Sequence, residues 1–265
     1  MAIWQYADVV RDEGAVKLAM TLAICPFCSS ELELLRDEKE DIGRSGEYET
    51  TEYQSWVCPT CGWWKCRSSF RHTDFGFRVR RESGAAASLR ALDLSDLSLP
   101  IEEVRSYLSA KYDQRFDLHP RLFELVVESV FKDHDYEAEA TAYTNDGGID
   151  VVLRKATGEQ IGVQVKRYKD SIEVEQIRSF AGTLFLNGYT RGIFITTSRF
   201  QKGGYGEAEK SALRGIPIEL WDASKFLDAL RIGQREMYQS TYDLRSYIEP
   251  SAFVTLSSND YRRRF

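Results

Sequence analysis

Two Cys-Pro-x-Cys pairs constrain the fold of this chain of 265 residues more than any other feature. The first is Cys25-Pro26-Phe27-Cys28, and the second is Cys58-Pro59-Thr60-Cys61, followed by Gly62. Each pair predicts a tight turn that aims two thiolates at one point, and two such turns make a tetrahedral four-sulfur site suited to Zn²⁺. All five cysteines lie in the first quarter of the chain, and such clustering favours metal binding over disulfides.

The segment around these pairs resembles a zinc ribbon over residues 20–80. Alternating apolar and polar residues predict short strands at 48–57, 63–70 and 75–79. The acidic stretch between the two pairs, residues 36–46, is expected to loop out. Two redox dithiols or reduced structural cysteines are the alternative. Cys66 is expected to be a buried thiol, and His72 is the residue that could replace one cysteine ligand.

Two roles for the ribbon stay open. Its aromatic residues and three arginines could offer stacking surfaces and phosphate contacts to DNA. The aromatic residues could equally form the small core of the unit, whose folding energy zinc would supply. The residues concerned are Trp56, Trp63, Trp64 and Phe70, with Arg78, Arg80 and Arg81 as the DNA-binding arginines.

A change of composition separates the ribbon from the rest of the chain. Residues 83–88 and 93–100 are small and polar, which predicts a linker, and a helix is expected at 101–111. We therefore expect a zinc-ribbon domain at 1–82, a linker and helix at 83–115, a second domain at 116–231, and a tail of unassigned role at 232–265.

The second domain has alternating helical and strand patterns, which predict an α/β (α+β) fold with a mixed central sheet flanked by helices. The expected order is α-β-β-β-α-β-α-β with a closing helix. The helices are expected at 120–132, 173–185, 206–214 and 224–230, and the strands at 137–143, 149–154, 161–166, 192–196 and 216–220.

The most informative stretch for chemistry runs from Asp146-Gly147-Gly148 to Lys166. Two strands joined by a polar turn predict a hairpin, and Asp150 opens its first strand. Gln164 and Lys166 are two residues apart on the second strand, so their side chains share a face. We expect Asp150 to come within ligand distance of Gln164.

This set of residues suits phosphodiester hydrolysis with a hard divalent ion. Mg²⁺ prefers oxygen ligands, which Asp150, the Gln164 amide and the Val165 carbonyl can supply. Lys166 can orient or deprotonate water and offset the charge that develops on phosphorus. Glu124 is a further candidate ligand on the helix at 120–132, although Glu128 shares its face. Arg167 and Lys169 are candidate phosphate contacts.

At this point residues 116–230 resemble the Mrr-type nuclease domain of the PD-(D/E)xK superfamily. Asp150 matches the motif aspartate, and Gln164-x-Lys166 matches the acid-x-lysine in the glutamine variant of this branch. Phe123-Glu124 matches the helix glutamate, and Thr196-Thr197-Ser198 followed by Phe200 matches the segment after the next strand. The resemblance implies a restriction-endonuclease-like fold, with Asp150, Gln164, Lys166 and Glu124 as catalytic residues and Mg²⁺ or Mn²⁺ as cofactor.

The resemblance also implies a DNA endonuclease of restriction or phage defence, acting on double-stranded DNA. Two rival hypotheses are a non-catalytic DNA-binding module of the same fold, and an effector nuclease held inactive until a co-encoded defence subunit or a signal releases it. A homodimer fits double-strand cutting, because that reaction usually needs two active sites.

The composition is compatible with these expectations. A net charge of −6 argues against a nucleic-acid coat protein, but a DNA enzyme needs only local basic patches. No stretch approaches the roughly 20 apolar residues that span a bilayer, so no membrane association is expected. The first residues lack the pattern of a secretory signal, and we expect a cytoplasmic protein.

Overall fold

The computed structural model describes residues 3–4, 9–44, 46–141, 148–238, 248 and 250–262, and the chain divides into two compact units. Unit 1 comprises Met1–Ala91 and Arg235–Phe265, and unit 2 comprises Leu92–Gln234. These boundaries differ from the expected ones, because the helix expected within the linker packs in unit 2 and the chain beyond α6 returns to unit 1 as a strand.

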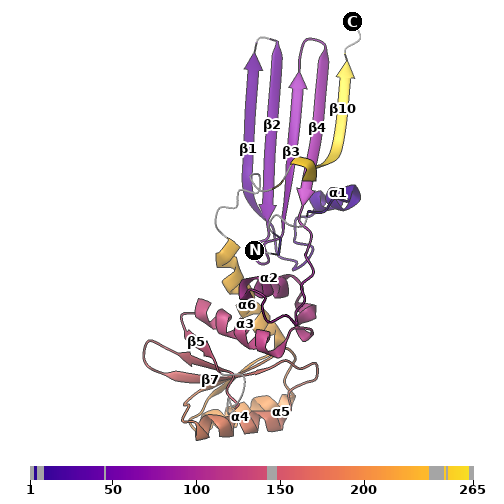
Figure 1. Ribbon diagram of the computed structural model, residues 1–265. Helices are drawn as coiled ribbons and strands as arrows, with labels where there is room; N and C mark the ends of the chain where they lie inside the picture. Colours follow the sequence, from indigo (N-terminus) through magenta and orange to yellow (C-terminus); the bar gives the residue numbers. More distant parts are fainter. Residues whose placement is uncertain are drawn as a thin grey trace. The chain divides into compact units, whose positions relative to one another are not determined.

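Unit 1 contains a five-stranded antiparallel sheet whose strands lie side by side (Figure 1). Its order is β1-β2-β3-β4-β10, so the last strand of the chain joins the edge of a four-strand meander. The strands are β1 (Glu33–Arg44), β2 (Glu47–Val57), β3 (Trp64–Thr73), β4 (Phe77–Ala86) and β10 (Val254–Arg262); a short 3₁₀ helix, η2 (Pro250–Ala252), precedes β10.

The expectation that residues 36–46 loop out is wrong, because residues 36–44 belong to β1. Polar contacts within the sheet stabilise their charged side chains. Lys39 Nζ forms an ion pair with Asp41 at 2.9 Å, and Thr50 Oγ1 of β2 donates a hydrogen bond to Asp41 at 2.8 Å. β1 is an edge strand, where charged side chains are common because they discourage pairing with other chains.

The expectation of a linker at 83–88 is also wrong, because residues 83–86 continue β4. Their small size reflects close packing. A side chain at Gly84 would meet Met20 of α1 (Glu13–Thr21) and Leu256 of β10 at 3.2–3.3 Å. Ala85 and Ala86 are fully buried.

Helix α1 was not expected from the sequence. Asp12 caps its start, accepting a hydrogen bond from the Ala15 amide at 3.0 Å. At its other end, the buried Lys65 of β3 donates to the carbonyls of Ala19 (3.2 Å), Met20 (3.3 Å) and Leu22 (2.5 Å). A cation at the C-terminal end of a helix complements the helix dipole, so Lys65 fixes α1 to the sheet.

Unit 2 contains a mixed sheet of order β5-β6-β7-β8-β9. β5, β6 and β7 are antiparallel neighbours, whereas β7, β8 and β9 are parallel. The expected order of elements is confirmed: α3 (Pro120–Asp133), β5 (Glu137–Ala140), β6 (Val151–Arg154), β7 (Gln160–Lys166), α4 (Val174–Leu186), β8 (Gly192–Thr196), α5 (Lys202–Leu213), β9 (Ile218–Trp221) and α6 (Ala223–Tyr238).

Helices cover both faces of this sheet (Figure 1). α4 and α5 bury one face through a core that includes Phe180, Leu184 and Phe194. α3 contacts the antiparallel strands, and its Phe123 meets Phe226 of α6 edge-on at 5.2 Å. α2 (Ile101–Ala110) packs on α3 and leads into the short 3₁₀ helix η1 (Tyr112–Phe116). The arrangement is the expected α+β fold, with a mixed central sheet flanked by helices.

A pair of glycines sets the distance between α4 and the sheet. Gly162 of β7 and Gly192 of β8 are register partners. A Cβ at Gly192 would fall 2.4 Å from the Leu184 side chain, and one at Gly162 would fall 2.8 Å from it. Such contacts do not occur in folded proteins, so the absence of side chains here lets α4 lie close against β7 and β8.

None of the helices in the described part of the chain is both long and apolar enough to cross a membrane.

Candidate functional site

The sulfur atoms of Cys25, Cys28, Cys58 and Cys61 all lie within 4.8 Å of one another in unit 1. Cys25 Sγ is 3.5 Å from Cys61 Sγ, and Cys28 Sγ is 3.3 Å from Cys58 Sγ and 3.7 Å from Cys61 Sγ. Four thiolates at about 2.3 Å from a tetrahedral Zn²⁺ would be about 3.8 Å apart. The four side chains therefore fit one ion of this size and could hold a metal.

The two pairs make equivalent turns. Gly62 donates its amide to the Cys58 carbonyl at 2.9 Å, and Ser29 donates to the Cys25 carbonyl at 3.0 Å. Both residues have positive φ, +78° for Gly62 and +61° for Ser29. Glycine adopts this conformation without steric cost, whereas Ser29 needs the surrounding turn to hold it there. The repeated turn converts the Cys-Pro-x-Cys spacing into convergent sulfurs.

Buried tryptophans surround the second turn. Trp63 and Trp64 are 2% and 1% exposed, and their indole N–H groups donate to the carbonyls of Ala87 and Trp4 at 2.8 Å. The indole N–H of Trp4 donates to the Cys61 carbonyl. The hypothesis that Trp63 and Trp64 stack on DNA is wrong, because both rings form the core of unit 1. Trp56 and Phe70 are half-buried.

The remaining thiol has a different environment. Cys66 is fully buried, lies outside the four-cysteine group, and points its sulfur at the Ala85 carbonyl at 3.7 Å. Burial raises the pKa of the Cys66 thiol to about 12. Burial also raises the pKa of Cys61 above its ordinary value, but there a bound cation would stabilise the thiolate. His72 contacts Glu49 at 3.0 Å and is not in the four-cysteine group.

The second candidate site, in unit 2, begins with Asp150, which directly precedes β6 and is only 8% exposed. Its backbone amide donates to the Val163 carbonyl at 2.8 Å, and its carboxylate accepts from the Val165 amide at 2.6 Å. The Asp150 carboxylate thus accepts the hydrogen bond of the Val165 amide that a backbone carbonyl of a longer β6 would otherwise accept. The Val165 carbonyl leaves the strand on the same side as its amide, so it points toward the carboxylate.

Gln164 and Lys166 of β7 face the same side of the sheet as α4. Their register partners on β8 are Phe194 and Thr196, and Phe194 packs under α4. Both side chains are half-buried. The Gln164 amide lies beside Gly148, since a Cβ added at Gly148 would be 3.7 Å from Gln164 Nε2 and 3.4 Å from Thr183 Oγ1 of α4. Asp146 and Gly147 lie outside the described residues.

A chain of hydrogen bonds through Arg121 and Thr141 connects Glu124 of α3 to the backbone of Asp150. The Arg121 guanidinium contacts the Glu124 carboxylate at 2.8 Å and the Thr141 carbonyl at 2.8 Å. Thr141 in turn donates its amide to the Asp150 carbonyl at 2.9 Å and its hydroxyl to the Ile149 carbonyl at 2.8 Å. Glu128 is instead paired with Lys132. Among the two helix glutamates, only Glu124 is tied to the backbone of Asp150.

Two buried threonines after β8 fix the chain that follows Lys166. Thr196 Oγ1 donates to the Lys166 carbonyl at 3.0 Å, and Thr197 Oγ1 donates to the Tyr168 carbonyl at 2.9 Å. Neither hydroxyl was assigned this role from the sequence, although the Thr-Thr-Ser segment was noted. Their contacts hold the end of β7, and hence Lys166, against β8.

The residues expected to contact phosphates differ in how exposed they are and in whether they already have partners. The Arg167 guanidinium is half-buried and donates to the Phe116 carbonyl, so it already has a structural contact. Lys169 is exposed, with its Nζ 5.8 Å from the centre of the Phe116 ring. In unit 1, Arg78, Arg80 and Arg81 are exposed on β4, and Arg80 is paired with Glu82.

Residues 116–230 match a family model, Mrr_cat, that is described as a restriction endonuclease. The type IV methyl-directed restriction enzyme EcoKMrr of Escherichia coli K12 is 30% identical over 112 residues, which are 39% of this chain and 37% of that protein. An uncharacterized protein of Sinorhizobium fredii, y4cE, is 27% identical over 175 residues, 61% of this chain and 42% of that protein. The chain thus spans about two fifths of the length of these relatives.

Solved structures with partial similarity include the DNA modification-dependent restriction endonuclease AspBHI and an EndoMS complex with double-stranded DNA. AspBHI aligns at 18% identity and a TM-score of 0.39, over 60% of this chain and 44% of that chain. EndoMS aligns at 14% identity and a TM-score of 0.29, over 72% of this chain and 86% of that chain. These scores are low, and the match over residues 116–230 is the more informative comparison.

Proposed function

Because residues 116–230 match the Mrr_cat restriction endonuclease model, we propose that this chain is a metal-dependent endonuclease that hydrolyses phosphodiester bonds of double-stranded DNA. The observation that carries the proposal is the placement of Asp150. Its buried carboxylate is held against the backbone of Val165, between the two residues Gln164 and Lys166 that share the facing strand.

The oxygen donors around Asp150 fit Mg²⁺ or Mn²⁺, which take carboxylate, amide and carbonyl ligands. Asp150, the Gln164 amide and the Val165 carbonyl would hold the ion, with Glu124 as a further ligand once released from Arg121. A bound ion of this kind polarises a phosphoryl oxygen and acidifies water.

The protein residues then have distinct roles in the reaction. The oxygen of water forms a bond to phosphorus, one ester P–O bond breaks, and the departing oxygen takes up a proton. Lys166 places its ammonium group where negative charge develops on the phosphoryl oxygens, or orients the attacking water. The hydroxyls of Thr196 and Thr197 hold the backbone after Lys166 and so position that ammonium group.

We propose further that the four cysteines of unit 1 bind Zn²⁺. The sulfur separations of 3.3–3.7 Å support a closed structural site with no open coordination position. Restriction of foreign DNA, phage defence and a cytoplasmic location are parts of the same proposal. These parts of the proposal are supported by the sequence similarity to EcoKMrr, whose name describes a methyl-directed restriction enzyme.

A cleavage assay tests the nuclease proposal. Plasmid and linear duplex DNA are incubated with the full chain and Mg²⁺ or Mn²⁺, comparing wild type with Asp150→Asn and Lys166→Ala. Each substitution is expected to lower the rate about 10³-fold, because it removes a metal ligand or a charge-stabilising group.

Glu128→Gln is the matched control, because it removes a carboxylate of the same helix that is paired with Lys132 and not with Arg121. Its rate should equal that of wild type. If the Asp150 and Lys166 variants cut DNA as well as wild type, the assignment is wrong. Wild-type protein that is inert alone and cuts only with a second protein would instead support an effector that needs activation.

A further inference from the structure

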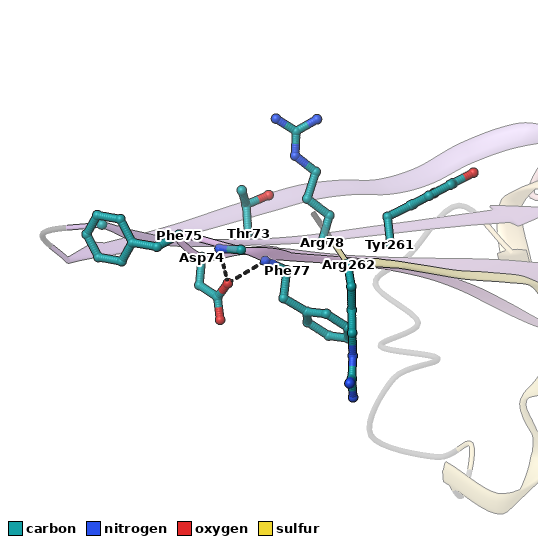
Figure 2. A pocket seen from close by; sticks show the side chains of 9 residues that line it. Thr73, Asp74, Phe75, Phe77, Arg78, Tyr261 and Arg262 are labelled. Atoms are coloured by element: carbon teal, nitrogen blue, oxygen red, sulfur yellow. Dashed lines mark hydrogen bonds between the residues drawn. The ribbon is translucent and has the colours of Figure 1, made fainter. Parts of the chain in front are cut away.

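The unit 1 sheet carries a group of exposed aromatic and basic side chains at the end opposite the four cysteines. The proposed nuclease site does not include them. Gly46, the turn that joins β3 to β4 and the end of β10 line an open pocket of about 510 Å³, and Figure 2 shows the side chains of Phe75, Arg78 and Tyr261 there. Phe75 is 76% exposed and Tyr261 is 64% exposed. We call this surface, formed by Phe75, Phe77, Arg78, Tyr261 and Arg262, the sheet end.

The turn that carries Phe75 is held in one shape. The Asp74 carboxylate accepts hydrogen bonds from the amides of Gly76 at 3.0 Å and Phe77 at 2.7 Å, and these bonds lower its pKa. The Phe75 ring lies against Gly46, where a Cβ would fall 2.0 Å from a ring carbon. Phe75 is thus supported by backbone on one side, while most of its surface faces solvent.

Guanidinium groups without acidic partners gather at the same place. Figure 2 shows Arg78 and Tyr261 on one side of the sheet and Phe77 and Arg262 on the other. Within the described ranges, neither Arg78 nor Arg262 has an ion pair, and Arg262 lies 5.8 Å from the centre of the Phe77 ring. Three arginines nearer the middle of the sheet do have acidic partners: Arg67 and Arg80 pair with Glu82, and Arg71 pairs with Glu52.

Exposed aromatic rings flanked by unpaired cations match nucleic acid better than an apolar protein surface. A protein partner without acidic residues would bury these guanidinium groups unpaired, which is costly. Duplex DNA offers phosphates to cations on both sides of an element, and apolar side chains such as phenylalanine can wedge between base steps.

We infer that the sheet end is a DNA-binding surface, in which Phe75 wedges into a base step and Arg78 and Arg262 contact phosphates. The inference rests on the proposed function, since it takes the duplex to be the substrate of the nuclease unit. It assigns recognition of the substrate to unit 1 and chemistry to unit 2.

Equilibrium binding of the full chain to a fluorescent DNA duplex, without Mg²⁺ or Mn²⁺, tests this inference. Phe75→Ala is expected to weaken binding about 10-fold, and Phe75→Trp should keep wild-type affinity, because an aromatic wedge is retained. Phe185→Ala is the matched control, since Phe185 of α4 is similarly exposed at 71%. Equal zinc content and equal thermal unfolding show that each variant is folded.

The arginines are tested through the salt dependence of binding. Arg78→Ala combined with Arg262→Ala should reduce the slope of log K against log salt concentration by about 2, because two phosphate contacts are lost. Arg11→Ala combined with Arg235→Ala removes the same charge from exposed positions elsewhere in unit 1 and should leave the slope unchanged.

The outcomes separate this inference from the nuclease proposal. If wild type cuts DNA and the sheet-end variants bind like their controls, the inference is overturned while the nuclease stands. If the sheet-end variants lose affinity but wild type never cuts, the sheet end is a DNA-binding surface, while the nuclease proposal fails and with it the role of the duplex as substrate.

Discussion

The four cysteines of unit 1 and the Asp150 cluster of unit 2 (Asp150, Gln164, the Val165 carbonyl and Lys166) are both candidate metal sites, but they are built differently. The cysteines are all buried, share one chemistry, and converge within 4.8 Å through two short turns. The Asp150 cluster combines a carboxylate, an amide, a backbone carbonyl and an ammonium group from two strands. The first site can hold unit 1 together, whereas the second is carried by a fold that already has its own core.

The largest expected difference between the two sites concerns metal removal. Stripping zinc should cost unit 1 on the order of 10 kcal/mol of folding free energy, because structural zinc sites contribute most of the stability of small metal-bound units. Removing Mg²⁺ should leave unit 2 folded. Hydrogen exchange measured on peptides from β3 and β8 checks both statements. Persistent protection of β3 after zinc removal would show that the sheet is stable without the metal.

A smaller effect is expected when the Asp150 carboxylate is changed. Asp150→Ala should lower the free energy of unfolding by about 1–3 kcal/mol, because the buried Val165 amide loses its acceptor. Asp150→Asn keeps an oxygen acceptor and should cost less than about 1 kcal/mol, while both variants lose cleavage. Urea unfolding gives the comparison. Equal stability of the two variants would mean that the Val165 contact contributes little to the fold.

A smaller effect than that of Asp150→Ala is expected at neutral pH for Cys66, the one thiol outside the cysteine site. Cys66→Ala should keep one zinc per chain and cost about 1 kcal/mol at pH 8, since a buried group of small volume is lost. Its raised pKa predicts a pH dependence. Between the ordinary thiol pKa near 9 and about 12, the unfolded chain releases the Cys66 proton while the folded chain keeps it.

Wild-type stability should therefore fall as pH rises above 9, by up to about 1.4 kcal/mol per pH unit, because the unfolded state binds fewer protons. In the Cys66→Ala variant this contribution is absent, so the stability difference between the two proteins should shrink from pH 8 to pH 10. Denaturant unfolding at the two pH values measures it. A constant difference would show that Cys66 does not titrate on unfolding.

The sequence predicted the elements of unit 2 well because its strands and helices each have a clear hydrophobic period. Strand Gly192–Thr196 and the start of α3 at Pro120 agree with the expected bounds. The shared face of Gln164 and Lys166 followed from the period of a strand. The contacts of Thr141, Thr196 and Thr197 could not be predicted, because each joins backbone atoms from separate elements.

Unit 1 was harder to predict because its strands are polar and paired by charge. The acidic alternation of β1 is typical of a solvated loop until the partner strand is known. The small residues of β4 predict a linker as readily as a closely packed strand, because flexible and closely packed segments use the same residue types. β10 shows no feature of its own that indicates pairing with β4, since its pattern of burial depends on that partner.

The antiparallel pairing of β4 with β10 has a practical consequence for experiments on this protein. Residues Leu92–Gln234 lie between these two strands in the sequence, so unit 2 is an insertion that is tethered at both of its ends. A single protease cut at either tether leaves both halves attached to one sheet. A tag fused after Phe265 is likewise attached to the unit that holds the four cysteines, so pull-down with such a tag would still recover the complete sheet after nicking.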